Sequence, residues 1–206
     1  SQSPRLFWIE LKEHLRSLGF SSSDIDPCLW IRDTGDSYTI ITIVVDDMIV
    51  ATDTDPAWLV DGLSRRFKMK DLGTCSYVLG MRVRRNREER RILLSQEGYI
   101  EKVLRAFNME EEAKTNKPRT PAARSVKLSA SDCVDYGDKR MPWPYRELVG
   151  SLLYACNTRP DIQYAVGVLT RFCKGPCKAH WKAAKRVLLY LAATKDIALR
   201  LGGGSR

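Results

Sequence analysis

Two adjacent aspartates, Asp46 and Asp47, are the residues of this sequence best suited to chemistry. They follow an apolar run rich in β-branched residues, 40–45, and a second apolar stretch, 48–51, comes directly after them. This pattern predicts two strands joined by an exposed hairpin turn, because adjacent carboxylates are not buried in an apolar core. Like charges this close repel each other unless a cation lies between them, and carboxylate oxygens prefer hard ions such as Mg²⁺ or Mn²⁺. The pair therefore predicts a divalent-metal site for phosphoryl transfer, although aspartate is also a common turn residue.

The distribution of charge favours a polyanionic partner. The chain carries a net charge of +9, but residues 1–61 sum to −7, residues 62–124 to +8, residues 125–170 to 0 and residues 171–206 to +8. Acidic residues thus gather around the Asp pair, and basic residues gather in two other segments. Because Lys and Arg hold phosphates, we predict that the chain binds nucleic acid; two solvated faces of opposite charge would give the same sums.

Composition excludes several other classes of protein. No apolar stretch approaches the roughly 18 residues that span a membrane, and the N-terminus lacks the basic-then-apolar order of a secretory signal. The six cysteines have no disulfide-like rhythm, so we expect free thiols, an intracellular protein and no membrane partner. Cys173, Cys177 and His180 have the spacing of a partial zinc site, but a packed pair of thiols and a histidine at a helix start explain them better.

The elements that position the Asp pair are a mixture of helices and short strands. Periodicity and turn residues predict helices at 5–18 and 55–67, and strands at 28–32, 38–45, 48–52, 77–85 and 91–95. The alternation predicts an α+β layer with helices on one face of an antiparallel sheet.

The second half of the chain is predicted to be mainly helical. Helices are expected at 96–107, 145–157, 161–174 and 178–193, with a final strand at 197–201. Residues 109–144 contain few apolar side chains and four prolines, which predicts a long loop or linker. We therefore divide the chain into segments 1–95, 96–144 and 145–206.

A series of short motifs runs along the chain in a fixed order. It comprises Gln2-Ser3-Pro4-Arg5 with Trp8, Val44-Val45-Asp46-Asp47, residues 67–73, Tyr77-Val78-Leu79-Gly80, residues 94–100, Thr120-Pro121, residues 145–154, Thr158-Arg159-Pro160-Asp161-Ile162 and His180-Trp181 with residues 184–186. This series resembles the copia-type (Pseudoviridae) retrotransposon reverse transcriptase, from inside the palm to just before the ribonuclease H domain. The resemblance implies an incomplete right-hand palm of α+β type, followed by a helical thumb and connection region.

The resemblance also implies a role for each motif. Asp46 corresponds to the hairpin ligand of a two-metal site that uses Mg²⁺ or Mn²⁺, and Asp47 supports the metals more loosely. Gln2 and Arg5 belong to a motif beside the template and the incoming nucleotide. Leu79 and Gly80 correspond to the primer grip, where glycine permits close backbone approach; a β-bulge would also explain Gly80.

Basic residues outside these motifs have two readings each. Lys68 and Lys70 are placed to reach phosphates, or are simply solvated. Lys182, Lys185 and Arg186 share a helix face with Lys178 and are placed to contact duplex backbone, or form an ordinary solvated face.

Two departures from the family pattern set the expected activity. Val44 stands where the family usually has a tyrosine before the Asp-Asp box. The first metal-binding aspartate and the fingers precede the Gln2 motif in this family, and neither stands before Ser1 in this sequence. We therefore expect weak metal binding and little or no polymerisation by this chain alone.

The expected partners follow from these departures. They are an RNA/DNA primer-template, the fingers and ribonuclease H regions of a polyprotein, and a partner chain that covers an open edge of the palm. The alternatives are a non-catalytic nucleic-acid-binding remnant and a structural protein that reuses the fold within a larger assembly.

Overall fold

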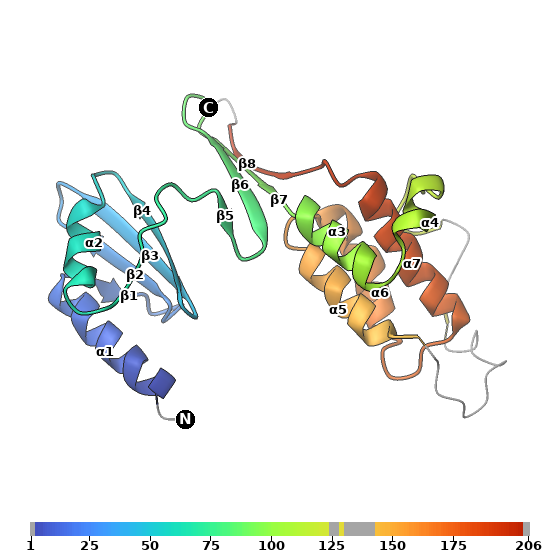
Figure 1. The fold of residues 1–206 in the computed structure, drawn as a ribbon, viewed down its shortest axis with the longest axis horizontal. Helices are drawn as coiled ribbons and strands as arrows, with labels where there is room; N and C mark the ends of the chain where they lie inside the picture. Colours follow the sequence, from blue (N-terminus) through green and yellow to red (C-terminus); the bar gives the residue numbers. More distant parts are fainter. Residues whose placement is uncertain (1–2, 124–127, 130–142, 204–206) are drawn as a thin grey trace. The chain divides into compact units, whose positions relative to one another are not determined.

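The computed structural model describes residues 3–123, 128–129 and 143–203, which form two compact units, Ser1–Cys75 and Ser76–Arg206 (Figure 1). These units do not follow the predicted segments 1–95, 96–144 and 145–206. The hairpin of residues 77–95 belongs to the second unit, because its last strand pairs with a strand near the C-terminal end. Strand pairing over a long sequence separation therefore sets the boundary.

The first unit is an antiparallel sheet covered on one face by two helices. It contains α1 (Ser3–Ser17), β1 (Ser21–Ser22), β2 (Leu29–Asp33), β3 (Tyr38–Val44), β4 (Asp47–Thr52) and α2 (Ala57–Ser64), and the strand order is β1-β2-β3-β4. Leu11 and Leu15 of α1 and Leu59 of α2 form one core with Trp30 and Ile41 of the sheet. The predicted α+β layer is confirmed here.

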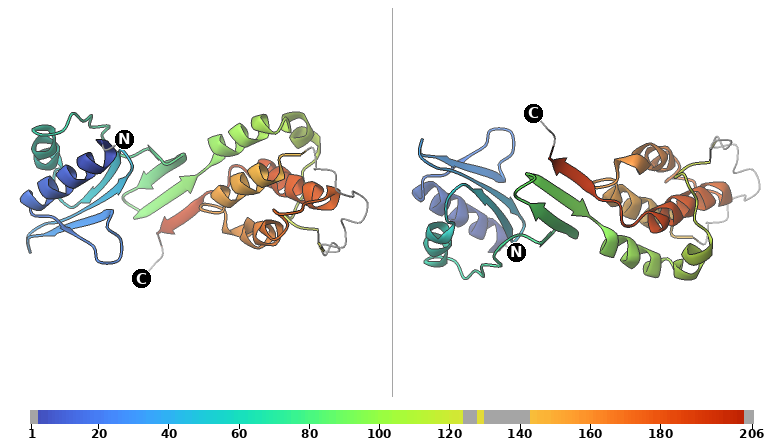
Figure 2. Two further views of the ribbon diagram at one scale, coloured as in Figure 1. Left: turned by 90° about the horizontal axis from the view of Figure 1, so that it is seen from below. Right: turned by 90° about the horizontal axis from the view of Figure 1, so that it is seen from above.

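The second unit joins a second antiparallel sheet to a group of helices. Its elements are β5 (Tyr77–Val78), β6 (Met81–Asn86), β7 (Arg91–Ser95), α3 (Glu97–Ala106), α4 (Glu110–Thr115), α5 (Tyr145–Ala155), the 3-10 helix η2 (Pro160–Ile162), α6 (Gln163–Thr170), α7 (Lys178–Ala193) and β8 (Leu199–Gly202). The strand order is β5-β6-β7-β8, and β7 runs into α3 while β8 lies beside β7 (Figure 2). Leu148, Leu152, Val166 and Leu188 lie in the core between the helices.

Four predicted elements need correction. Residues 77–85 are two strands rather than one, because the chain turns at Leu79 and Gly80. The predicted loop 109–144 contains α4, whose three glutamates at the first turn suit the positive end of a helix dipole; residues 124–127 and 130–142 lie outside the described residues. The helix predicted at 55–67 ends at Ser64, and the helix predicted at 161–174 begins as η2 and ends at Thr170.

A buried arginine fixes the end of α7 to the segment that follows α5. Arg159 is 1% exposed and makes two hydrogen bonds to Asp161, at 2.9 and 2.7 Å. It also donates to the carbonyl and the hydroxyl of Thr194, at 2.9 and 2.7 Å. Burial would raise the pKa of Asp161, but hydrogen bonds from Arg159 and Tyr190 outweigh burial and lower this pKa below its ordinary value. The motif at 158–162 therefore has a structural role, because it joins the end of α7 to the segment after α5.

The expectations about thiols and membranes can be stated for the described part of the chain. Cys28, Cys75, Cys156 and Cys173 are free thiols there, as predicted. The Sγ of Cys177 lies 3.4 Å from the Nδ1 of His180, and Cys133 lies outside the described residues. In the same part of the chain, no helix has the length and apolar character needed to cross a bilayer.

Candidate functional site

The Asp pair lies at the end of the β3–β4 hairpin, one residue out of the predicted register. Val44 pairs with Asp47, so the turn consists of Val45 and Asp46, and Asp47 is the first residue of β4. Val45 has a positive φ of 56° and is 84% exposed. The expectation that both aspartates occupy the turn is therefore wrong, because the two-residue connection leaves Asp47 in the strand ladder.

The pairing also determines which face of the sheet carries Asp47. Residues directly opposite each other in an antiparallel pair point to the same face, and neighbours along a strand alternate. Ile43 belongs to the core beneath the helices, so its neighbour Val44 and the partner Asp47 lie on the other face. Asp47 therefore lies on the face of the sheet that α1 and α2 leave open.

Both carboxylates are available to a cation from solvent. Asp46 and Asp47 are exposed, and neither makes an ion pair or side-chain hydrogen bond within the described residues. In that part of the chain there is also no group of three or more His, Cys, Asp or Glu placed to hold a metal. Mg²⁺ is often bound through one or two carboxylates, with water and substrate phosphates completing its shell. The two aspartates fit such an ion as a partial site.

The Leu79-Gly80 pair forms a second tight turn, between β5 and β6. Leu79 and Gly80 have φ values of 47° and 73°, and two positive φ values are typical of a two-residue type I′ hairpin. Gly80 is thus a turn residue, and the alternative explanation by a β-bulge is wrong at this position. A type I′ turn leaves no extra residue on either strand.

Helix α5 contacts this turn through Tyr154. The Tyr154 hydroxyl donates a hydrogen bond to the Leu79 carbonyl. A Cβ atom added at Gly80 would lie 2.9 Å from the same hydroxyl oxygen, which is closer than real Cβ contacts allow. The ring of Tyr154 packs edge-on against Tyr99 with 4.7 Å between ring centroids. A larger residue at position 80 would therefore be strained by its φ and would displace the Tyr154 hydroxyl.

A buried polar network holds Tyr154 in place. Gln96, at the start of α3, donates to the Tyr154 carbonyl at 3.2 Å and accepts a hydrogen bond from Thr158 at 2.7 Å. Gln96 and Thr158 are 2% and 1% exposed. The Tyr99 hydroxyl donates to the Ser151 carbonyl at 3.1 Å, and burial raises the pKa of Tyr99, so this donor stays protonated. Sequence reasoning noted these motifs but missed that they converge on the turn, since Gly80 and Tyr154 are 74 positions apart.

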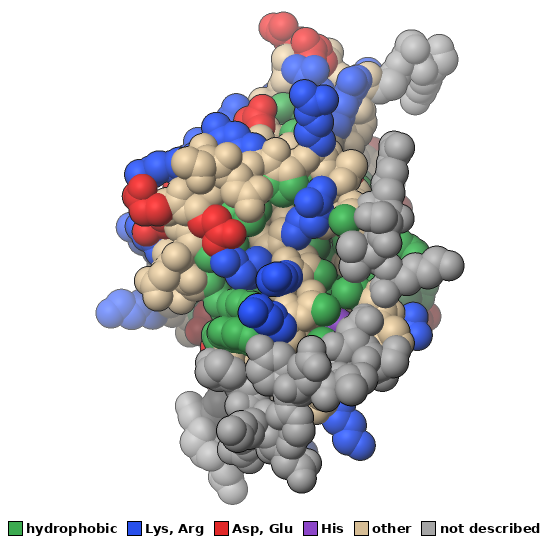
Figure 3. Space-filling view, turned by 90° about the vertical axis from the view of Figure 1, so that its right-hand side faces the viewer, with side chains coloured by type: hydrophobic (Ala, Val, Ile, Leu, Met, Phe, Trp, Pro, Cys, Tyr) green, Lys and Arg blue, Asp and Glu red, His purple; other side chains and the backbone are tan. Residues whose placement is uncertain are grey.

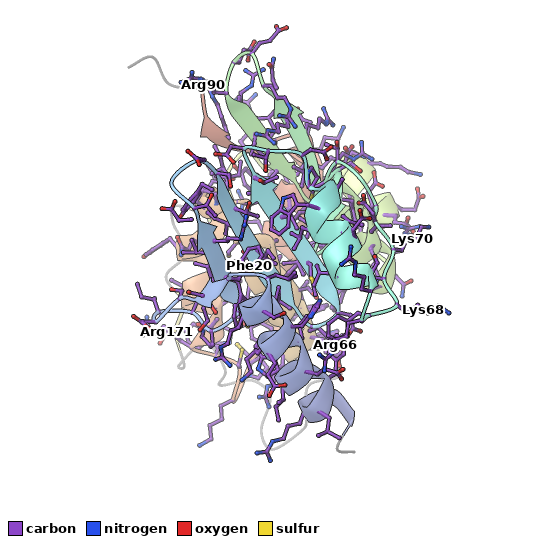
Figure 4. All side chains as sticks on the ribbon, turned by 90° about the vertical axis from the view of Figure 1, so that its left-hand side faces the viewer. Phe20, Arg66, Lys68, Lys70, Arg90 and Arg171 are labelled. Carbon is purple, nitrogen blue, oxygen red and sulfur yellow. The ribbon has the colours of Figure 1, made fainter. Side chains whose placement is uncertain are left out.

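The predicted basic contacts of the first unit lie in exposed positions. Lys68 and Lys70 follow α2 and point outward from the loop (Figure 4), and neither makes an ion pair within the described residues. Arg5 is exposed on α1, and Gln2 lies outside the described residues. Both lysine side chains are therefore accessible to a phosphate group.

The predicted basic face of α7 is partly occupied by the protein itself. Figure 3 views the side of the molecule that carries α4 and α7, and Lys and Arg side chains lie there among hydrophobic ones. Lys185 forms an ion pair with Glu112 of α4, and Arg186 donates to the Thr120 hydroxyl at 3.2 Å. Lys182 is exposed. Of the three predicted contacts on this helix, Lys182 is the most accessible to a nucleic acid.

His180 has the structural role expected from the sequence. It is fully buried at the start of α7, where its Nδ1 accepts a hydrogen bond from the Cys177 backbone N–H at 3.1 Å. Its ring stacks on Phe172 with centroids 3.9 Å apart, and its Nε2 lies 3.2 Å from the Ser129 carbonyl. These contacts suit a neutral ring with the proton on Nε2.

Comparison with known proteins gives this arrangement its context. Residues 1–121 match the family model described as "Reverse transcriptase (RNA-dependent DNA polymerase)". The chain belongs to the reverse transcriptase family. Among its relatives, the retrovirus-related Pol polyprotein from transposon TNT 1-94 of Nicotiana tabacum is 40% identical over 210 residues, which cover 98% of this chain and 16% of the polyprotein.

Two further relatives extend the family across plants and yeast. The retrovirus-related Pol polyprotein from transposon RE1 of Arabidopsis thaliana is 38% identical over 99% of this chain and 14% of its own length. The putative transposon Ty5-1 protein of Saccharomyces cerevisiae is 32% identical over 100% of this chain and 65% of its own length. No solved structure matches the chain. The resemblance to copia-type reverse transcriptases is confirmed, and the chain spans about a sixth of the TNT 1-94 polyprotein.

Proposed function

We propose that this chain is the part of a retrotransposon reverse transcriptase that carries the Asp-Asp hairpin of the palm, the primer-grip turn and the helical thumb and connection region. It would serve RNA-templated DNA synthesis within a longer Pol polyprotein. One observation carries the proposal. Two exposed, unpaired aspartates end a hairpin beside the open face of a sheet, in a chain that aligns over 98% of its length with a Pol polyprotein.

Asp46 and Asp47 would hold Mg²⁺ or Mn²⁺ together with other ligands. When bound, such ions align the primer hydroxyl with the nucleotide triphosphate and neutralise charge on the phosphates. The chain's own contribution is to present two carboxylates on a short hairpin, where no basic side chain of the described residues competes for them.

The nucleic acid would be positioned by the backbone turn and by exposed cations. The Leu79-Gly80 turn, held by Tyr154, would place the primer end, because its backbone can approach a ligand closely at glycine. Phosphate contacts are assigned to Arg5, Lys68, Lys70 and Lys182, with Gln2 beside the template. Lys185 and Arg186 would contribute only after leaving Glu112 and Thr120.

The partners in this proposal are a primer-template and the other regions of a polyprotein, namely fingers and ribonuclease H. β4 is an edge strand of its sheet, and its unpaired backbone groups suit coverage by a partner chain. The setting would be intracellular, in a cytoplasmic particle or the nucleus.

The proposal can be tested in a chimeric polymerase in which this chain replaces the matching segment of the TNT 1-94 polyprotein. Primer extension on an RNA template with Mg²⁺ or Mn²⁺ should be retained by the chimera. It should fall at least about 100-fold in Asp46→Asn, since removal of a metal ligand costs several kcal/mol of transition-state stabilisation. Asp24→Asn is the control, because Asp24 is also exposed in the first unit. A folded but inactive chimera, or equal activity of Asp46→Asn and the parent, would overturn the proposal.

A further inference from the structure

One face of the second sheet presents arginines from two strands that are far apart in sequence. Arg84 of β6 lies opposite Leu93 of β7, and Leu93 lies opposite Arg200 of β8. Arg82 shares this face because it lies two residues before Arg84 on the same strand. Tyr77 lies opposite Arg82 and so belongs to the same face. We call Arg82, Arg84 and Arg200 the arginine face. The pairing of β8 with β7 creates it, bringing together residues 116 positions apart.

The other face of this sheet is mainly apolar, and Arg85 is its one arginine among the paired residues of β6, β7 and β8. Val83, Leu94 and Leu199 form one cross-strand row, and Ile92 lies opposite Leu201 in the next row. None of these five side chains is fully buried within the described residues. Partly exposed apolar rows of this kind favour contact with protein, whereas arginine side chains favour solvent. The sheet is therefore amphipathic, and the arginine face carries most of its charge.

The charge of the arginine face is not neutralised by the protein. Arg82 and Arg84 are exposed and make no ion pair within the described residues, and Arg200 donates only to the backbone carbonyls of Gly202 and Gly203. Arg91 lies on the same face, two residues from Leu93, but it is left out of the set because it forms an ion pair with Glu89 at 2.6 Å. Uncompensated guanidinium groups at this spacing match a polyanion in charge.

The spacing also suits a sugar-phosphate backbone. Arg82 and Arg84 are two residues apart on a strand, or about 7 Å, and a nucleic-acid strand advances about 3.4 Å per phosphate. Tyr77 is 66% exposed beside Arg82 and offers a ring on which a base can stack. We infer that the arginine face binds the phosphate backbone of nucleic acid, as a contact surface additional to the predicted site residues. This inference rests on the proposed function, since the same primer-template would contact the arginine face and the predicted site residues.

The chain itself provides a matched control for this inference. Arg85 is exposed on the same strand, directly after Arg84, but it pairs with Ile92 and so lies on the apolar face. Arg84→Ala and Arg85→Ala remove the same charge from adjacent positions on opposite faces. Both changes are at exposed residues, and circular dichroism would establish that each variant keeps the fold.

The experiment measures binding of a labelled primer-template by this chain between 50 and 300 mM salt. We expect Arg84→Ala to weaken binding by about two- to fivefold, and to lower the slope of log K against log salt by about 0.9. Arg82→Ala with Arg84→Ala should lower the slope by about 2. Arg85→Ala should change both quantities by less than half as much as Arg84→Ala.

The outcomes separate this inference from the proposed function. Equal effects of Arg84→Ala and Arg85→Ala would overturn the inference, because they would reflect net charge rather than one face. Parent-like binding by the Arg84→Ala variant would overturn it while leaving the proposed function in place. If the parent chain does not bind primer-template at 50 mM salt, the nucleic-acid role proposed for the whole chain fails with it. Binding of the parent chain to anionic lipid vesicles but not to the oligonucleotide would overturn the inference, and would assign the arginine face to a lipid surface.

Discussion

Val45 has a backbone conformation that its own side chain disfavours. It sits in the turn beside Asp46 with a φ of 56°, a region in which β-branched residues are rare. Such strain is common at functional sites, where the surrounding structure holds the residue in place. In this hairpin the two paired strands hold Val45, and its strained position lies next to the candidate metal ligands.

Replacing Val45 with glycine should relieve this strain. A non-glycine residue at positive φ costs roughly 1–2 kcal/mol, and glycine's added chain entropy offsets about half of the gain. We therefore expect Val45→Gly to raise the free energy of unfolding of the first unit by about 0.5–1 kcal/mol, measured by urea denaturation. Val50→Gly, in the extended part of β4, should lower it by about 1 kcal/mol. A loss of stability in Val45→Gly would show that the turn is not strained.

Asp161 compensates a buried charge in the second unit. In Asp161→Asn, Arg159 keeps its hydrogen bonds to Thr194 but loses its only ion-pair partner within the described residues. We expect the free energy of unfolding to fall by about 2–4 kcal/mol, because an uncompensated buried cation is costly. Asp196→Asn, at an exposed aspartate, should change it by less than about 0.5 kcal/mol. Equal small effects of both changes would contradict the assigned role.

The same pair predicts how stability depends on pH. Because the pKa of Asp161 is lowered in the folded state, its contribution is fully present above the unfolded-state pKa, about 3.9. It is lost as the pH falls through the lower pKa of the folded state. Thermal unfolding of the parent chain should therefore show a drop in stability below about pH 4 that is smaller in Asp161→Asn. An identical acid-side drop in both proteins would count against this contribution.

At the scale of elements, the Leu79-Gly80 turn depends on α5. Gly80→Ala brings two costs: the positive φ of 73° and the 2.9 Å approach of the new Cβ to the Tyr154 hydroxyl. We expect a loss of about 2–3 kcal/mol in the free energy of unfolding. Gly35→Ala is the matched control, since Gly35 has a φ of 80° with no atom within 4 Å of the added Cβ, and it should cost only about 1 kcal/mol.

A double-mutant cycle with Tyr154→Phe separates these two costs. Removal of the hydroxyl leaves the nearest ring carbon at 3.7 Å from the added Cβ, an ordinary contact. Gly80→Ala should therefore cost about 1 kcal/mol less in the Tyr154→Phe background. Hydrogen exchange of the turn amides provides a second measurement, and additive effects in the cycle would refute the contact.

The sequence predicted the type of most elements but not the contacts between them. The helices at α3, α5 and α7 follow apolar stripes, which report burial of one helix face directly. The register of the Asp hairpin was missed by one residue, because the apolar run 40–45 continues into the turn and Val45 resembles a strand residue. The contact of Tyr154 with Gly80 and the pairing of β8 with β7 join distant parts of the chain, and no local pattern encodes them.

At the scale of the whole molecule, the two units have separate cores. Leu15 and Leu148 are both fully buried, the first in the unit of residues 1–75 and the second in the unit of residues 76–206. We expect Leu15→Ala and Leu148→Ala each to destabilise its own unit by about 3 kcal/mol and the other by less than about 0.5 kcal/mol. Hydrogen exchange resolved by peptide would report the two units separately. Loss of protection throughout the chain in either variant would mean that the units unfold together.

The pairing of β8 with β7 has a consequence for synthesis on the ribosome. β7 ends at Ser95, but its partner in the sheet, Leu199–Gly202, begins 104 positions later in the chain. At about 5–20 residues per second, the edge of β7 stays without its partner for roughly 5–20 s. During that interval a nascent chain exposes one open strand beside the apolar side chains Ile92 and Leu94. Chaperone capture of the nascent chain, or pairing with a neighbouring nascent copy on the same polysome, would compete with folding at this edge until β8 emerges.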